Sequence, residues 1–334
     1  MSENRAMLEQ AIDRLFIDLA GNGARHPADV KSHWQAIADI GLPDLLLPEA
    51  SGGFRGDWSD AAFVFAALGR HGIALPVGEA ILARRWLHEA RVEIPEGIGT
   101  FAFAPDLDSV PWGKSADWVL LLHSSKWLLM SGATGEPGAN LAGDPRDRMV
   151  FSAPPLACGR LNHGPAALFA EAALLRTCQI SGAIETMLAM SVDHANQRTQ
   201  FGKPIGRLQA IQQQLALLTG ESAATACAAA SAAQAADKGD AAFEIAAAKW
   251  RANHAAAIAA DIAHQVHGAI GITREYPLHY FTLRAQAWSA EYGNERHWAG
   301  WLADFVTAER GRPLWHRLTE RSDRLTDGIA GKQP

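Results

Sequence analysis

The sequence predicts a mainly α protein with a small central β-domain. Two alanine-rich or periodic regions carry apolar residues at three- and four-residue spacing, which is typical of helices. Between them, short apolar runs alternate with Pro, Gly, Asp and Ser clusters, which is typical of strands. We therefore expect an N-terminal helical domain, a reduced middle β-domain, a C-terminal four-helix bundle and a polar tail, over residues 1–96, 97–160, 161–320 and 321–334.

The first domain is predicted to contain four helices. In the first, apolar residues such as Leu8, Ile12 and Leu15 recur on one helix face. Glycine and proline then separate the periodic segments, because they end helices or favour turns. The predicted helices cover residues 6–20, 30–40, 59–69 and 77–89.

The middle domain is predicted to hold four short strands, each an apolar run between turn-forming residues. They cover Thr100–Ala104, Trp118–Leu122, Trp127–Met130 and Met149–Ser152.

The last domain is rich in alanine, which has the highest helix propensity and allows helices to approach closely. We expect four long helices over residues 166–196, 208–238, 241–267 and 278–309. From about residue 320 the chain has few apolar residues, so we expect this tail to fray.

Composition excludes several classes of protein. The 334 residues are 48% apolar and 20% charged, without an apolar run long enough to span a bilayer and without a secretory signal pattern, so we expect a soluble, cytoplasmic protein. A net charge of −6 without a long Lys/Arg run argues against a nucleic-acid partner. Cys158, Cys178 and Cys227 form no close pair, so we expect buried free thiols.

The segment 196–216 combines groups suited to a nucleotide. The guanidinium of Arg198 could hold a diphosphate through paired hydrogen bonds, and Phe201 offers an apolar surface beside it. From the residues alone, an ion pair between Arg198 and a nearby carboxylate remains an open alternative.

This segment resembles a motif of the acyl-CoA dehydrogenase family, R-x-Q-F-G-x-x-[IL]-x-x-x-Q. The matching positions are Arg198, Gln200, Phe201, Gly202, Ile205 and Gln209. The resemblance implies FAD as cofactor, with Arg198, Phe201 and Gln209 contacting its diphosphate and adenosine across a subunit interface and Gln200 in the same binding segment.

A second segment, residues 263–288, is similar to the family's glutamine- and glycine-rich stretch. Gln265, Gly268, Gly271, Glu275 and Pro277 are in register, which implies a cofactor-binding role for Gln265, for Gly268 and for Ala269, which follows it. Ala269 stands where the family often has glycine, and should be tolerated unless the backbone there needs a positive φ. His264 and His267 are spaced for one helix face, but we predict no metal site.

A third segment, residues 288–301, lies where many relatives have Y-E-G-T, whose glutamate removes the α-proton of the acyl-CoA. Gly293 aligns with the motif's glycine, which puts Tyr292 at the base position and Glu291 one residue early. Because a tyrosine with a pKa of about 10 is a poor base near neutrality, Glu291 is the better candidate. Asn294 and Arg296 replace the family's flavin-contacting Thr and Gln.

The middle domain departs furthest from the family. Only Phe101–Ser109 and Lys126–Gly132 are faintly similar to its flavin-covering segments, and the region is too short to bind isoalloxazine in the usual way. The pattern resembles the short subunit of heterotetrameric bacterial acyl-CoA dehydrogenases. It implies FAD-dependent α,β-dehydrogenation of an acyl-CoA, in fatty acid or steroid side-chain degradation, with a flavin site shared between chains.

The implied partners are an acyl-CoA substrate, a homologous subunit or a second copy of the chain, and an electron-transfer acceptor. Two alternatives remain open. One is a self-sufficient homo-oligomeric dehydrogenase with Glu291 as base. The other is a non-catalytic helical scaffold that has lost flavin, in which Trp288, Trp298 and Trp301 would be buried in a subunit interface.

Overall fold

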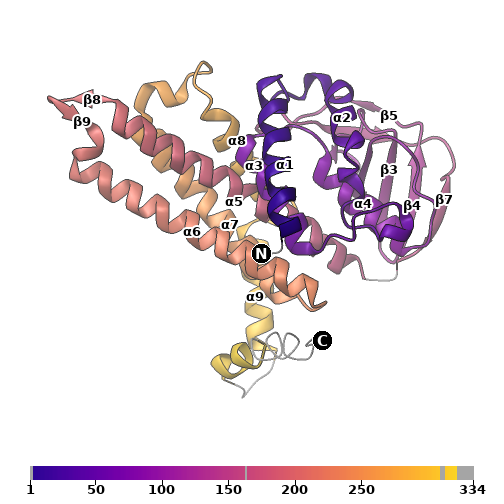
Figure 1. Ribbon diagram of the computed structural model, residues 1–334. Helices are drawn as coiled ribbons and strands as arrows, with labels where there is room; N and C mark the ends of the chain where they lie inside the picture. The colour runs from indigo at the N-terminus through magenta and orange to yellow at the C-terminus, as the bar shows by residue number, and fades with distance from the viewer. Residues whose placement is uncertain (1–2, 162–163, 309–312, 322–334) are drawn as a thin grey trace.

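The computed structural model describes residues 3–161, 164–308 and 313–321. N-terminal helices and small sheets lie together on one side, and long helices form a bundle that extends away from them (Figure 1). This arrangement confirms the predicted mainly α fold with a small β region. Within the described residues, no helix is both long and apolar enough to cross a membrane.

The four predicted N-terminal helices are present, with ends close to those expected. Asp57 and Asp60 form a capping box at the start of α3, and Gly72 ends this helix with a φ of 65°. The helices are α1 (Glu3–Gly21), α2 (Val30–Asp39), α3 (Trp58–His71) and α4 (Val77–Glu89).

The middle region forms two small sheets with strand orders β1-β3-β4-β7 and β2-β6-β5. Strands β1 and β3 pair in parallel and the other pairs are antiparallel. The bounds are β1 (Gly99–Phe103), β2 (Val110–Pro111), β3 (Trp118–His123), β4 (Lys126–Ser131), β5 (Thr134–Glu136), β6 (Arg146–Val150) and β7 (Ala157–Arg160). The sequence missed β2, β5 and β7, because each is too short for an apolar run to stand out.

The bundle contains α5 (Pro165–Gln197), α6 (Gln209–Asp237), α7 (Ala242–His267), α8 (His279–Ala290) and α9 (Glu295–Thr307). The predicted single helix over 278–309 is therefore wrong. Its apolar periodicity continues across the break, but Tyr292 and Gly293 have φ values of 52° and 94°, which no right-handed helix accommodates.

Glycines fix the N-terminal helices onto the bundle. A Cβ at Gly69 on α3 would collide with the carbonyl of Gln179 on α5, and one at Gly182 with the carbonyl of Ala66. The two helices therefore pack backbone against backbone. One large apolar cluster then runs from the N-terminal helices through the sheet into α5, and the predicted division into four domains stays a prediction.

Arg284 on α8 joins the three regions of the chain. Its buried guanidinium pairs with Asp144 from the middle region at 2.9 Å, and donates to the carbonyls of Gly72 and Arg25 at 3.0 and 2.7 Å. Because a buried guanidinium needs partners for its donors, this set fixes where α8 lies.

The cysteine prediction holds for one residue only. Cys178 is buried within α5, and burial raises the pKa of its thiol to about 12. Cys158 and Cys227 are exposed, because one lies on the strand β7 and the other on the outer face of α6. The tail prediction for residues 322–334 falls outside the described part of the chain.

Candidate functional site

The predicted FAD motif forms an exposed hairpin at the far end of the bundle from the sheets (Figure 1). Strands β8 (Thr199–Gln200) and β9 (Lys203–Pro204) are joined by Phe201 and Gly202, whose φ values are 53° and 76°. Two positive φ values fit a tight two-residue hairpin turn, which is strained at a phenylalanine. The side chain of Phe201 is 87% exposed, so the hairpin holds an aromatic ring in solvent.

Arg198 follows the last residue of α5 and is exposed, as are Gln200 and Gln209. Among the ion pairs of the described residues, none involves Arg198. The alternative in which Arg198 pairs with a nearby carboxylate is therefore not the arrangement found, and the guanidinium is free to meet an anion from outside.

The second predicted segment lies at the same end of the bundle. The rings of His194 on α5 and His267 on α7 stack 4.6 Å apart, which brings the end of α5 beside the turn that follows α7. Gly268 has φ 63° and ψ −141°, a conformation open essentially to glycine alone, whereas Ala269 has no positive φ. The alanine is thus accommodated, and both Gln265 and Ala269 are exposed.

The histidines of this end have packing partners. Nδ1 of His267 donates to the carbonyl of Ala263 at 2.7 Å, and the hydroxyl of Tyr276 is 3.1 Å from Nε2. Burial lowers the pKa of His267 and of His194, which favours their neutral forms. The described residues contain no cluster of three or more His, Cys, Asp or Glu side chains arranged for a metal.

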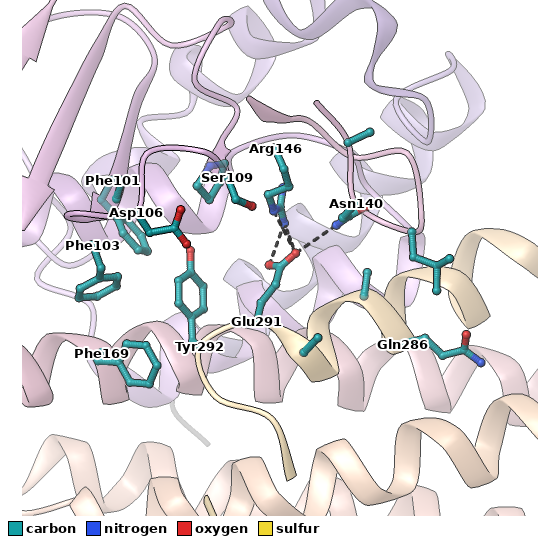
Figure 2. Close-up of a pocket in the computed structure, with 16 residues that line it drawn as sticks. Phe101, Phe103, Asp106, Ser109, Asn140, Arg146, Phe169, Gln286, Glu291 and Tyr292 are labelled. Carbon is teal, nitrogen blue, oxygen red and sulfur yellow. Dashed lines mark hydrogen bonds and ion pairs between the residues drawn. The ribbon is translucent and has the colours of Figure 1, made fainter. Parts of the chain in front are cut away.

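Glu291 lies at the other end of α8, where two arginines hold it. Nη2 of Arg146 donates to both its oxygens at 2.6 and 2.8 Å, and Nε of Arg176 donates to Oε2 at 2.7 Å. Nδ2 of Asn140 adds a bond of 3.1 Å, and Figure 2 shows Arg146 and Asn140 converging on the carboxylate.

The pairing extends into the core. Arg176, 1% exposed, also donates to Glu79 and Gln179, both at 2.6 Å. The charges of the two arginines and the two glutamates therefore cancel, because buried charges are stable only when they are paired. We call Glu79, Arg146, Arg176 and Glu291 the four-charge cluster.

This environment opposes the predicted role of Glu291 as base. Burial alone would raise its pKa, but Arg146 and Arg176 outweigh burial and lower the pKa to about 2. A carboxylate with so low a pKa is a weak proton acceptor at neutral pH. The role of Glu291 as base stays a prediction.

Tyr292, at the aligned base position, has a left-handed backbone and packs its ring among aromatic side chains. The ring centroids of Phe101 and Phe169 lie 5.7 and 6.1 Å from the ring centroid of Tyr292. Its hydroxyl is buried without a hydrogen-bond partner, and burial raises the pKa of the phenol. This environment favours the neutral phenol, and the role of Tyr292 at the base position stays a prediction.

A pocket of about 570 Å³ opens beside these residues, between β1 and α8 (Figure 2). It is lined by aromatic and small apolar side chains with a few polar ones: Phe101, Ala102, Phe103, Asp106, Ser109, Pro111, Ala139, Asn140, Leu141, Arg146, Phe169, Gln286, Ala287, Ala290, Glu291 and Tyr292. We call it the cleft pocket.

The predicted cofactor residues are thus divided between the two ends of α8. Asn294 caps α9 by accepting from the backbone N–H of His297 at 3.0 Å, and Arg296 is exposed beside it. Because α8 has 12 residues, about 18 Å of helix separates them from the hairpin end. One chain does not bring the two groups together.

The sequence did not indicate some residues of this site, and it predicted an interface position for others that are buried within the chain. Nothing singled out Arg146, Asn140 or Glu79, although a lone arginine within the apolar run of α5 could have marked Arg176 as a buried charge. Trp288 and Trp298 are each 3% exposed within this chain and offer no surface to a subunit interface, whereas Trp301, the third tryptophan of the scaffold alternative, is half-buried.

Comparison with known proteins identifies the family. The acyl-CoA dehydrogenase C-terminal domain matches residues 166–297. The acyl-CoA dehydrogenase IpdE2 of Mycobacterium tuberculosis is 31% identical over 301 residues, covering 85% of this chain and 91% of that protein. This chain belongs to the acyl-CoA dehydrogenase family. Its members are oxidoreductases acting on acyl-CoA.

Two solved structures have the same fold as this acyl-CoA dehydrogenase chain. The Tcur3481-Tcur3483 steroid ACAD G363A variant has a TM-score of 0.80 at 22% identity, covering 92% of this chain and 98% of that one. The ChsE4-ChsE5 complex from Mycobacterium tuberculosis has a TM-score of 0.77 at 20% identity, covering 93% and 99%.

Proposed function

We propose that this chain takes part in FAD-dependent α,β-dehydrogenation of an acyl-CoA, as a subunit that shares its flavin site with a homologous partner chain. The observation that carries the proposal is the exposed hairpin end. Arg198 has no ion-pair partner in the described part of the chain, and Phe201 and Gln209 of the same segment are exposed too.

The hairpin residues fit the nucleotide half of the cofactor. A guanidinium can hold a diphosphate by two parallel charge-assisted hydrogen bonds, and the ring of Phe201 offers a face for apolar contact. The backbone at Gly268 allows a close approach at the same end of the bundle. When bound, FAD supplies the acceptor for the hydride that leaves the β-carbon of the acyl group.

The cleft end fits the flavin poorly, which is the reason for invoking a partner. The four-charge cluster leaves Glu291 ion-paired, and the aromatic rings around Tyr292 occupy space beside it. We therefore assign proton abstraction to a base from the partner chain.

The names of the relatives are in line with a two-chain enzyme. One solved relative is described as a ChsE4-ChsE5 complex and another as a Tcur3481-Tcur3483 steroid ACAD. For this chain we extend the proposal to a bulky acyl-CoA of fatty acid or steroid side-chain degradation, with an electron-transfer acceptor downstream and a cytoplasmic location.

The test is flavin retention in the purified complex of this chain with a co-expressed longer homologue. Arg198→Met should lower the flavin absorbance per protein by about tenfold, because the diphosphate loses its charge-assisted bonds. Arg207→Met is the matched control, an exposed arginine in the same connection that should leave flavin bound. If the chain alone holds stoichiometric FAD and oxidises an acyl-CoA, the sharing proposal is wrong.

A further inference from the structure

The last carbonyl groups of α8 lie close to α7 and need hydrogen-bond donors from outside their own helix. A helix leaves its final carbonyls without partners, and a carbonyl shielded from water costs free energy when it has no donor. The break before α9, which we call the α8–α9 turn, covers residues 291–294. It adds the carbonyls of Tyr292 and Gly293, whose backbone is left-handed.

Lys249 on α7 supplies donors to both sets of carbonyls, and its side chain is fully buried. Nζ lies 3.1 Å from the carbonyl oxygen of Trp288 and 3.2 Å from that of Gly293. Oδ1 of Asn253, one helical turn along α7, accepts from Nζ at 2.6 Å, and Nδ2 of Asn253 donates to the Gly293 carbonyl at 3.1 Å. Lys249 and Asn253 therefore tie the α8–α9 turn to α7.

The charges around Lys249 do not balance its ammonium group. Glu291 in the turn attracts it and Arg176 on α5 repels it, but Glu291 is already shared by Arg146 and Arg176. Other charges on the elements packed against α7 are engaged in pairs: Glu221 of α6 with Arg251, Glu295 of α9 with His254, and Arg284 of α8 with Asp144.

A lysine in this setting holds its proton weakly. Burial lowers the pKa of the Lys249 amine from its ordinary 10.5 to about 7, a change that Glu291 opposes and Arg176 adds to. If the turn opens to water, the burial is lost and the pKa returns toward 10.5. Opening between these two pH values is therefore accompanied by uptake of a proton.

We propose that the α8–α9 turn opens and closes with the binding and release of a proton at Lys249. The amine takes a proton from water when the turn opens and returns it when the turn closes. Because Glu291 and Tyr292 belong to the turn and line the cleft pocket, opening rearranges one wall of that pocket. The inference concerns this chain by itself and does not depend on the shared flavin.

The direction of the pH effect follows from the two pKa values. Below pH 7 the amine is protonated in both states, so opening is independent of pH. Between pH 7 and pH 10.5 the open turn binds more protons than the closed turn, so a rising pH favours the closed turn. Opening should become rarer by about tenfold between pH 8 and pH 9.

The test is hydrogen–deuterium exchange of the full chain, in the oligomer in which it purifies. The reporter amides are those of Glu291 and Trp298, which donate to the carbonyls of Trp288 and Asn294, both at 3.2 Å. The chemical step of exchange speeds up by about tenfold per pH unit, since hydroxide catalyses it. In the wild type, rarer opening should cancel this increase, so the exchange rate should change by less than about twofold between pH 8 and pH 9.

Lys249→Met removes the proton site and keeps the length of the side chain. In this variant the same amides should show the ordinary increase of about tenfold between pH 8 and pH 9. Lys126→Met, which changes an exposed lysine on β4, is the matched control and should behave like the wild type. The amide of Gly52, which donates to the carbonyl of Glu49 in an exposed turn, should show the increase in every chain.

The outcomes separate this inference from the proposed function. A nearly constant exchange rate at the turn of the wild type, with a steep increase in Lys249→Met, supports the inference. A steep increase at the turn of the wild type overturns it, and Gly52 gives the reference in the same molecule even if the variant does not fold. A constant rate in Lys249→Met also overturns it, since another group would then bind the proton. The Arg198→Met result bears on the shared flavin and leaves this inference unaffected.

Discussion

The arginines at the two ends of α8 differ in exposure and in ion pairing. At the hairpin end, Arg198 is exposed and has no ion-pair partner within the described residues, and Phe201 is held in solvent on a strained turn. At the cleft end, Arg146 and Arg176 are buried and fully engaged. An arginine available to a ligand and an arginine committed to the fold can occur in one chain, and burial with partners distinguishes them.

Arg176→Met should have the largest effect on stability. It leaves Glu79 and Glu291 without their shared cation, and removing one partner of a buried ion pair costs about 3 to 5 kcal/mol. We expect the midpoint of thermal unfolding to fall by roughly 10 °C. Arg198→Met is the comparison, with a midpoint near that of the wild type, and equal losses in the two variants would contradict the contrast.

Glu291→Gln should have a smaller effect that depends on pH. The folded-state pKa of Glu291, about 2, is below its ordinary 4.5, so its contribution to stability is present above pH 4.5 and is lost as the pH falls from 4.5 toward 2. We expect the variant to be less stable by about 2 to 3 kcal/mol at pH 7, with the gap closing in acid. Denaturant unfolding at several pH values measures this, with Glu275→Gln as an exposed control.

The same variant decides the role of Glu291 in turnover. If it is the base, Glu291→Gln should abolish acyl-CoA oxidation by the complex while flavin stays bound. From its ion pairs we expect most of the activity per folded complex to remain. Single-turnover flavin bleaching by the acyl-CoA, normalised to bound flavin, separates the two results.

Gly293→Ala should disturb the cleft end by a smaller amount. Gly293 has a φ of 94°, and an added Cβ would collide with the indole of Trp298, so we expect a loss of about 2 kcal/mol. Gly300→Ala on α9 is the control, because its Cβ would meet open space. That control should be neutral or slightly stabilising, and a harmless Gly293→Ala would show that the turn tolerates a side chain.

Phe201→Asn should give the smallest effect and the opposite sign. Asparagine followed by glycine is the pair preferred in such hairpin turns, so relief of strain should stabilise the chain by up to about 1 kcal/mol. The same change should reduce flavin retention by the complex, because the aromatic contact is lost. Thermal unfolding and flavin absorbance, measured on one preparation, would show whether stability rises while flavin retention falls. Unchanged flavin retention would contradict a role of Phe201 in flavin binding.

Periodicity was enough to predict most of the fold, because the long helices α5, α6 and α7 repeat their apolar positions over many turns. It failed at Tyr292 and Gly293, since the break between α8 and α9 comes from backbone angles and not from a loss of apolar residues. The hairpin end was recognisable because its residues are adjacent in sequence. The four-charge cluster was not, because Glu79, Arg146, Arg176 and Glu291 meet only in the folded chain.

The anchoring of Arg284 also bears on how the chain acquires its structure during synthesis. The bond from its guanidinium to the carbonyl of Arg25 joins residues 259 positions apart. At ribosomal rates of about 5 to 20 residues per second, roughly 13 to 50 s pass between the two. The N-terminal helices must wait that long for this contact, so a nascent chain stalled before α8 should expose this surface to chaperones.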